Sequence, residues 1–294
     1  MNIIITIPAY NEGSTIKSAI ENIINAMKST RYKYKILVVD DGSKDNTYEI
    51  AKNTGAIVYK HNQNLGLAQT FRTEMEKCLE NNADIIVHFD ADNQYLASEI
   101  PLLIGYVEKG YDLVLGSRFL GKIEYMPWLK RFGNKAFSEV ISKICSKKIS
   151  DAQTGFRAFK KDVAKNIQVT SNYTYTQEQV IRCIKKGYRV IEVPVYFARR
   201  NDKSRLMKNP FHYAAKAGIN LLRVYRDYEP LKFFCSIGIM SLSIGLILGI
   251  YLIYLHFTTG IVGHTPLIIF TTLTLIAGLQ IILFGFLADM LRKA

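Results

Sequence analysis

Short apolar runs alternate with helix-forming stretches along the first 120 residues. The runs are rich in Ile, Val and Leu, as is typical of strands buried in a parallel sheet. They cover Ile3 to Ile7, Ile36 to Asp40, Ile57 to Tyr59, Ile85 to Phe89, and Leu113 to Leu115. The helix-forming stretches between them are Ser14 to Ser29, Asn46 to Asn53, Leu67 to Glu80, and Glu99 to Lys109. This alternation predicts βαβ units and an α/β fold with a mostly parallel, doubly wound sheet.

The pattern changes after about residue 230. Phe233 to Leu255 and Pro266 to Ala288 contain no Asp, Glu, Lys, Arg or His. At about 1.5 Å per residue, each run is long enough to cross a hydrocarbon core about 30 Å thick. We predict two transmembrane helices. The alternative is a buried helical hairpin of a soluble protein, whose helices seldom run this long without a charge.

An amphipathic stretch, Asn209 to Tyr228, precedes the first apolar run. If it is helical, its apolar and aromatic residues share one side and most of its charges lie on the other. We interpret it as a helix lying in the membrane interface, with an ordinary helix packed on the globular part as the alternative. The sequence thus predicts a globular domain over residues 1–208, an interfacial helix over 209–230 and a two-helix anchor over 231–294.

The charge is concentrated in the globular part. The 294 residues carry a formal net charge of +13, and only Lys232, Asp289, Arg292 and Lys293 are charged after residue 230. The first 230 residues therefore carry +11, which suits nucleic acid, an anionic membrane or a phosphorylated ligand. The apolar tail favours the membrane, so we expect a bilayer partner and no nucleic acid.

Basic residues flank the apolar pair but are missing from its connection. The segment His256 to Thr265 contains no Lys or Arg, whereas Arg223, Arg226 and Lys232 precede the first run and Arg292 and Lys293 follow the second. By the positive-inside rule, we expect an integral membrane protein with its globular domain and both termini in the cytoplasm.

Unusual polar residues follow the predicted strands. Strand ends lead into Pro8 to Glu12, Asp40 to Ser43, Asp90 to Gln94, and Gly116 to Arg118. In doubly wound sheets, ligands bind beyond the carboxyl ends of the strands. We therefore expect these four segments to form one site.

Asp90 and Asp92 are the strongest candidates for metal ligands. Two carboxylates at positions i and i+2 after a strand point the same way and can share one divalent cation, with Gln94 adding an oxygen. Hard oxygen ligands without a His or Cys cluster favour Mg²⁺ or Mn²⁺ over zinc. Asp40 and Asp41 either accept hydrogen bonds from a ribose or base, or cap the following helix. Neither a dinucleotide-binding Gly-x-Gly-x-x-Gly nor a P-loop is present, so a metal would hold any phosphates.

These motifs resemble family 2 glycosyltransferases of the glycosyltransferase-A fold, a Rossmann-like, mostly parallel sheet, and among them the polyprenyl-phosphate (dolichyl-phosphate) hexose synthases. The resemblance spans about Ile3 to Arg205. It rests on Ile7 to Glu12, Val38 to Ser43, Asn64 to Ala68, Asp90 to Gln94, Gly116 to Arg118, Arg131 to Asn134, Asp151 to Arg157, Tyr175 to Glu178, and Glu192 to Val195. It implies a nucleotide-sugar donor, a polyprenyl or dolichyl phosphate acceptor and inversion at the anomeric carbon.

The resemblance also implies roles for individual residues. The nucleotide sugar would be held by Pro8, Ala9, Tyr10, Glu12, Asp40, Asp41, Asp90, Ala91, Lys203 and Arg205, and the metal by Asp90, Asp92 and Gln94. The acceptor phosphate would be held by Arg118, Arg131 and Asn134. The implied catalytic residues are Asp90, Asp92, Arg118, Arg131, Asp151 and Arg200.

Some of these implications stay open. The segment Arg200 to Arg205 is similar to a basic loop that closes on the diphosphate, but Asp202 replaces the usual glycine. A phosphate with a second pKa of about 6 is largely dianionic at neutral pH. It therefore barely needs a general base, and Asp151 or Glu178 could instead orient an arginine. An alternative to phosphate binding is a structural ion pair, for each of Arg118, Arg131 and Arg157. We expect His61 and His88 to be packing or surface residues.

Two other functions are compatible with the sequence. One is transfer to a lipid or polysaccharide hydroxyl, although the Gln-x-x-Arg-Trp of processive synthases is absent around the sole tryptophan, Trp128. The other is a non-catalytic membrane adaptor, which the intact Asp90 and Asp92 argue against. The sugar, the nucleotide base and assembly into a homo-oligomer are not decided by the sequence.

Overall fold

The computed structural model describes residues 1–170, 175–199, 219, 222–260 and 265–293. It divides into two compact units, Met1–Ala214 and Ala215–Ala294. The predicted boundary at residues 208 and 209 lies outside the described residues, so the division into three parts stays a prediction.

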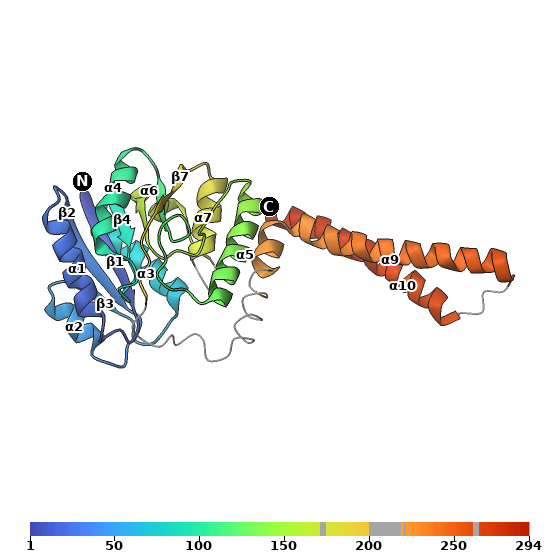
Figure 1. Cartoon of the computed structure of the whole chain (residues 1–294), viewed down its shortest axis with the longest axis horizontal. Coiled ribbons are helices and arrows are strands. Elements are labelled where there is room, and N and C mark those ends of the chain that lie inside the picture. Colours follow the sequence, from blue (N-terminus) through green and yellow to red (C-terminus); the bar gives the residue numbers. More distant parts are fainter. Residues whose placement is uncertain (171–174, 200–218, 220–221, 261–264, 294) are drawn as a thin grey trace. The chain divides into compact units, whose positions relative to one another are not determined.

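A seven-stranded mixed sheet forms the centre of the first unit (Figure 1), in the order β3-β2-β1-β4-β6-β5-β7. Its strands are β1 (Asn2–Ala9), β2 (Lys33–Asp40), β3 (Ile57–Lys60), β4 (Ile85–His88), β5 (Leu113–Ser117), β6 (Arg157–Lys160) and β7 (Val190–Pro194). Only β6 is antiparallel to its neighbours, β4 and β5. The predicted α/β fold with a mostly parallel sheet is confirmed.

Helices cover the sheet in the first unit. They are α1 (Ile16–Lys28), α2 (Thr47–Asn53), α3 (Leu67–Glu80), α4 (Ile100–Glu108), α5 (Trp128–Cys145), α6 (Lys161–Asn166) and α7 (Thr176–Lys185), with a short 3₁₀ turn at Ala97–Glu99. Side chains alternate between the two faces of a strand. Ile3, Ile5 and Ile7 of β1 accordingly join α1 and α4 in the main core, whereas Thr6 bonds Glu74 of α3. Both faces of β1 are thus buried, which explains its continuous apolar run.

The strands that carry the predicted site end at one edge of the sheet. Ala9, the last residue of β1, is paired in register with Asp40, the last residue of β2. Thr6 is paired with His88 at the end of β4. Parallel pairing therefore brings the segments after Ala9, Asp40 and His88 together, as the sequence predicts.

The second unit contains two long helices, α9 (Pro230–Thr259) and α10 (Thr265–Lys293). They approach closely at glycines: a Cβ atom on Gly278 would lie 3.0 Å from the Gly238 carbonyl oxygen. Ser241 Oγ donates a hydrogen bond to the Thr274 carbonyl oxygen at 2.9 Å. Small residues and hydroxyl groups of this kind are typical of paired helices in membranes.

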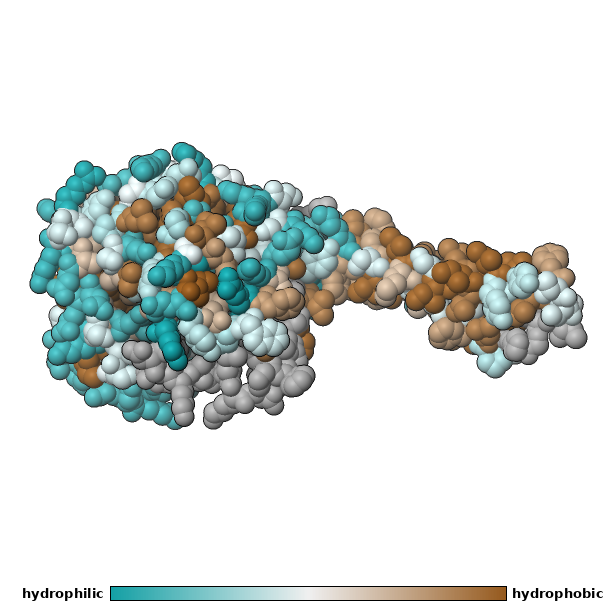
Figure 2. Space-filling model, viewed as in Figure 1, coloured by the Kyte–Doolittle hydropathy of each residue, from teal (hydrophilic) through white to brown (hydrophobic). Residues whose placement is uncertain are grey.

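The surface of α9 and α10 is mostly hydrophobic, whereas that of the first unit is largely hydrophilic (Figure 2). Both helices are long and apolar enough to cross a membrane: an 18-residue stretch has a mean hydropathy of 2.2 in α9 and 2.4 in α10, and 11% of each stretch is buried. A core helix of a soluble protein would be mostly buried. The exposure therefore indicates membrane association.

The predicted interfacial helix falls mainly outside the described residues. Of it, the structure describes Ile219 and residues 222–228, which are helical, and the side chains of Ile219 and Leu222 are exposed. Its position at a membrane interface stays a prediction.

Candidate active site

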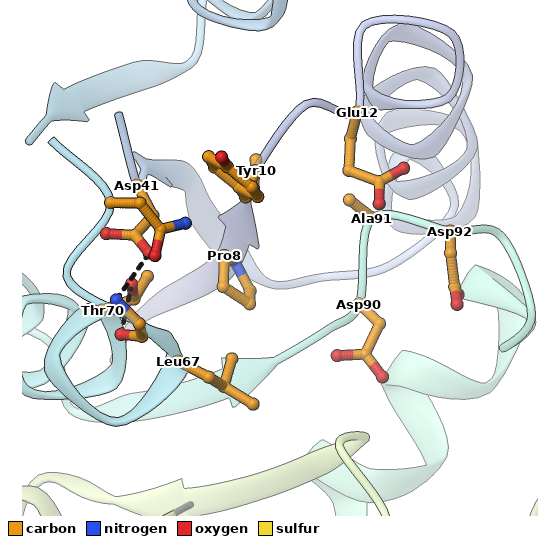
Figure 3. Close-up of a pocket in the computed structure, with 12 residues that line it drawn as sticks. Pro8, Tyr10, Glu12, Asp41, Leu67, Thr70, Asp90, Ala91 and Asp92 are labelled. Carbon is orange, nitrogen blue, oxygen red and sulfur yellow. Dashed lines mark hydrogen bonds between the residues drawn. The ribbon is translucent and has the colours of Figure 1, made fainter. Parts of the chain in front are cut away.

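A cavity of about 400 Å³ lies at the carboxyl edge of the sheet. Figure 3 shows Asp41, Pro8 and Asp90 arranged across it, with Glu12 and Asp92 on the side of Asp90. Eight residues predicted for the donor or the metal line it, namely Pro8, Ala9, Tyr10, Glu12, Asp41, Asp90, Ala91 and Asp92. Four further lining residues had no predicted role, namely Asn64, Gly66, Leu67 and Thr70.

Asp41 organises the loop that closes one side of this cavity. Its carboxylate accepts hydrogen bonds from the backbone N–H groups of Leu65 and Gly66, each at 2.9 Å. It also lies 2.8 Å from Nδ1 of His61, whose other ring nitrogen is 3.0 Å from Thr73 Oγ1. The carboxylate therefore holds the 61–66 loop in place, and His61 has a structural role.

Gly42 lets this loop approach the end of β2. Its φ angle is +70°, which favours glycine. A Cβ atom there would also lie 2.8 Å from the backbone nitrogen of Asn64. Glycine at this position is required both by the turn and by the space it leaves.

Asp40, the last residue of β2, is not part of the cavity lining. Its side chain is fully buried, and Oδ1 accepts a hydrogen bond from the Ser43 N–H at 3.0 Å. Oδ2 has no hydrogen-bond partner among the described residues, and Lys60 Nζ is 3.9 Å away. Its predicted contact with the base or ribose stays a prediction.

Asp90 and Asp92 follow β4 and are both half-buried. Figure 3 shows their side chains leaving the 90–92 segment in the same direction. Asp92 Oδ1 accepts a hydrogen bond from the Gln94 N–H at 3.1 Å. The side-chain nitrogen of Gln94 donates to the Ala198 carbonyl oxygen at 3.2 Å, so only its amide oxygen could serve a metal.

The residues present suit a hard divalent cation bound together with substrate. Two carboxylates line one cavity on the same side of one segment, and no His or Cys lines it. No group of three or more His, Cys, Asp or Glu residues that could hold a metal gathers in the part of the chain that the structure describes. Mg²⁺ and Mn²⁺ typically take one or two carboxylates, with phosphates and water completing the shell. Asp90 and Asp92 fit that pattern.

Arg118 and Asp151 form a buried, two-pronged ion pair. Arg118 Nε donates to Asp151 Oδ2 at 2.7 Å, and Nη2 donates to Oδ1 at 2.8 Å. Burial lowers the pKa of Arg118, but the negative charges around it, including that of Asp151, raise the pKa on balance. Asp151 orients an arginine, as one reading of the sequence allows, and both its oxygens are occupied by that arginine. Glu178 likewise bonds an arginine, since its Oε1 accepts from Arg182 Nε at 2.7 Å.

The other predicted acceptor residues lie on α5. Arg131 is exposed there, whereas Asn134 is buried with its amide nitrogen 3.9 Å from Met126 Sδ. Near Arg131, Trp128 and Phe132 are 79% and 69% exposed, which is unusual for large apolar side chains. This end of α5 therefore combines cationic and aromatic groups at the surface. The predicted loop residues Arg200, Lys203 and Arg205 lie outside the described residues.

A buried polar network next to Asp90 was not predicted from the sequence. His88 and Glu74 are both fully buried, with His88 Nε2 3.2 Å from Glu74 Oε2. Burial lowers the pKa of His88, but the charge and hydrogen bond of Glu74 raise it more, so the pKa lies above its ordinary value. The sequence offered one signal of this network: Glu74 falls on the core side of α3, and carboxylates are almost never fully buried unless they are paired.

Comparison with known proteins identifies the family. Residues 4–168 match glycosyl transferase family 2. The chain belongs to this family. It is a glycosyltransferase, with the sheet expected of the glycosyltransferase-A fold.

Its relatives extend over most of the chain. It is 27% identical over 286 residues to glycosyltransferase AglJ of Haloferax volcanii, covering 97% of this chain and 91% of that protein. It is 31% identical to dolichyl-phosphate hexose transferase of the same organism, covering 73% of this chain and 90% of that protein. It is 33% identical to the UDP-N-acetylglucosamine–dolichyl-phosphate N-acetylglucosaminyltransferase of Methanococcus voltae, covering 66% and 84%.

A solved structure has the same fold. Glucosyl-3-phosphoglycerate synthase from Mycobacterium tuberculosis, in complex with Mn²⁺ and UDP-glucose, aligns with a TM-score of 0.59. The identity is 17%, and the alignment covers 76% of this chain and 78% of that one.

Proposed function

We propose that this glycosyltransferase moves a hexose from a nucleotide-sugar donor to a polyprenyl or dolichyl phosphate at a membrane. The observation that carries the proposal is the cavity at the carboxyl edge of the sheet, which is lined by Asp90 and Asp92 on one side and by Asp41 and the 61–66 loop on the other. We place the nucleoside of the donor on the side of the 61–66 loop. We place its diphosphate on the side of Asp90 and Asp92.

Mg²⁺ or Mn²⁺ held by Asp90 and Asp92 would stabilise the negative charge that develops on the departing nucleoside diphosphate. The manganese complex of the structural neighbour, although distant in sequence, supports this assignment. The chain's own residues bind and orient: Pro8 and Tyr10 line the donor cavity, and Asp41 fixes the loop beside it.

The acceptor is assigned from three lines of support. Relatives at 31% and 33% identity are named for dolichyl phosphate. The chain has two apolar helices long enough to span a bilayer. Exposed Trp128 and Phe132 lie near Arg131 on α5, and aromatic and cationic side chains together suit a lipid phosphate at an interface.

A phosphate acceptor is already a nucleophile at neutral pH, being largely dianionic there. The full occupation of Asp151 by Arg118 supports a reaction without a protein base. We assign Arg131 to the acceptor phosphate and Arg118 to the wall next to it, with attack inverting the anomeric carbon. From the charges around the apolar runs, we place the first unit and both termini in the cytoplasm.

The test is transfer by the purified full chain in detergent. A panel of UDP- and GDP-sugars, labelled in the sugar, is incubated with Mn²⁺ and a short-chain polyprenyl phosphate. We expect label in an organic-phase product that mild acid releases, as expected of a glycosyl phosphate. Asp92→Asn should reduce the rate at least about 100-fold, with Asp84→Asn, far from the cavity, as the matched control. Label on a lipid hydroxyl, or no dependence on Asp92, would overturn the proposal.

A further inference from the structure

Asp90 lies directly against the backbone of Gly155, which precedes β6. A Cβ atom on Gly155 would be 2.7 Å from Asp90 Oδ1 and closer still to Oδ2, distances that real Cβ atoms do not show. Gly155 is not among the glycines with positive φ, so its conformation is open to other residues. The missing side chain matters here for the space that it leaves to the Asp90 carboxylate.

The turn that contains Gly155 is held by buried donors. His88 Nδ1 lies 2.9 Å from the Gly155 carbonyl oxygen and therefore donates to it. Arg157 Nη2 donates to the Thr154 carbonyl oxygen. Thr154 Oγ1 in turn donates to the Gly116 carbonyl oxygen on β5 at 2.7 Å. The carbonyl groups of Thr154 and Gly155 are thus both held by hydrogen bonds from buried side chains.

His88 is itself held in place. Glu74 Oε2 lies 3.2 Å from its Nε2, while Glu74 Oε1 accepts a hydrogen bond from Thr6 Oγ1 on β1 at 2.8 Å. The hydroxyl of Tyr175 lies 3.2 Å from the ring nitrogens of His88. The His88–Glu74 contact therefore links β4 to α3, with both side chains fully buried.

We propose that the Thr154–Gly155 turn is a platform that positions the Asp90 carboxylate for the divalent cation, and that the His88–Glu74 pair holds this platform. The inference rests on the proposed function, in which Asp90 and Asp92 hold that cation. Metal–oxygen distances tolerate displacements of only about 0.2 Å. If the turn is displaced by more than this distance, the Asp90 carboxylate no longer lies within coordination distance of the cation. His88, Glu74 and Gly155 are positioning residues, since each acts through Asp90.

The experiment measures Mn²⁺ binding to the full chain in detergent by electron paramagnetic resonance. UDP or GDP is present, whichever raises the thermal unfolding midpoint of the unmodified chain. Gly155→Ala should weaken Mn²⁺ binding by about 10–100-fold, the range for residues behind metal ligands. Its nucleotide affinity in EDTA should stay unchanged. Gly105→Ala on α4 is the matched control, because a Cβ atom there meets nothing within 4 Å.

Glu74→Gln is the second variant. It keeps the size of the side chain and an acceptor for Thr6, but it removes the charge that holds His88. We expect weaker Mn²⁺ binding in the same direction as for Gly155→Ala. If Gly155→Ala does not fold, Glu74→Gln alone decides.

The outcomes distinguish the metal site from the positioning role of Gly155, His88 and Glu74. If the unmodified chain binds no Mn²⁺ with either nucleotide, the proposed metal site itself is wrong. If the unmodified chain binds Mn²⁺ and the folded variants bind it equally well, the metal site stands and the positioning role is wrong. A lower unfolding midpoint with unchanged Mn²⁺ affinity would likewise contradict the inference, because it would show a structural role only.

Discussion

Asp151 and the pair Asp90 and Asp92 lie at the carboxyl edge of the sheet in different surroundings. Asp151 is fully buried, and its charge is balanced by the two-pronged contact with Arg118. Asp90 and Asp92 are half-buried and line the cavity. We propose that Asp151 stabilises a wall of the site through Arg118, and that Asp90 and Asp92 hold a cation that arrives with substrate.

Removal of the charge on Asp151 tests this division. Asp151→Asn keeps the shape but leaves the Arg118 guanidinium buried without its counter-charge, which typically costs about 3–5 kcal/mol. The exposed pair between Arg31 and Glu108 provides the control, because Glu108→Gln should cost less than about 1 kcal/mol. Thermal unfolding midpoints of the two variants measure the difference. Equal, small losses would show that the buried pair does not stabilise this wall.

Arg131 is the exposed arginine of the predicted acceptor set. Arg131→Ala should raise the KM for the lipid phosphate by about tenfold, the effect of losing roughly 1.4 kcal/mol of binding, and leave the KM for the donor nearly unchanged. Lys135→Ala, another exposed cation on α5, controls for net charge. Initial rates at varied donor and acceptor separate the two constants. A larger effect on the donor would reject Arg131 as an acceptor contact.

Among the elements, the second unit depends on close approach of α9 and α10. Gly278→Ala should lower the thermal unfolding midpoint, because its Cβ atom would press on the Gly238 carbonyl and on Leu242. Gly249→Ala is the matched control, since its Cβ atom would lie 3.8 Å from Thr271 Cγ2, an ordinary contact. Calorimetry in detergent measures both midpoints. A larger loss for Gly249→Ala would show that the helices pair differently.

Five of the seven strands could be predicted from their apolar runs, which are buried in β1, β2, β4 and β5 and half-buried in the edge strand β3. β6 and β7 were missed. β6 begins at Arg157, which is fully buried but polar in sequence, so a hydropathy pattern counts it as exposed. The lengths of the two apolar helices were underestimated at both ends, because polar residues such as Lys232 and His256 also lie within them.

Cavity residues that follow β1, β2 and β4 could be predicted because parallel strands end at a common edge. Asn64 to Thr70 could not, since they reach the cavity only through the contact of their loop with Asp41. The His88–Glu74 pair joins a strand to a helix, and nothing in the spacing of the two residues indicates that they meet. Pairing between elements is decided by tertiary packing.

For the whole molecule, we propose that the first unit carries out the reaction and that the second attaches the protein to the membrane. The first unit holds the cavity, and the second presents apolar helices (Figure 2). A polyprenyl chain leaves the bilayer only at a cost of about 0.8 kcal/mol per exposed CH₂. An enzyme that uses such an acceptor therefore has to work at the membrane, and α9 and α10 would keep it there.

Removal of all residues after Tyr228 tests the role of α9 and α10. The shortened chain should remain in solution without detergent and use short-chain polyprenyl phosphates, but lose most of its activity on long-chain acceptors in vesicles. Transfer assays with both acceptors measure the ratio. Inactivity even on short-chain acceptors would mean that the helices help to form the site itself.

We propose that Asp90 and Asp92 together hold a divalent cation on the donor diphosphate. This can be seen in an anomalous difference map at the manganese absorption edge, from crystals of the full chain with Mn²⁺ and an unreacted donor. We expect a peak about 2.0–2.4 Å from carboxylate oxygens of these two aspartates, with donor phosphate oxygens completing the shell. A donor bound in the cavity with no peak there, or with manganese on other residues, would contradict it.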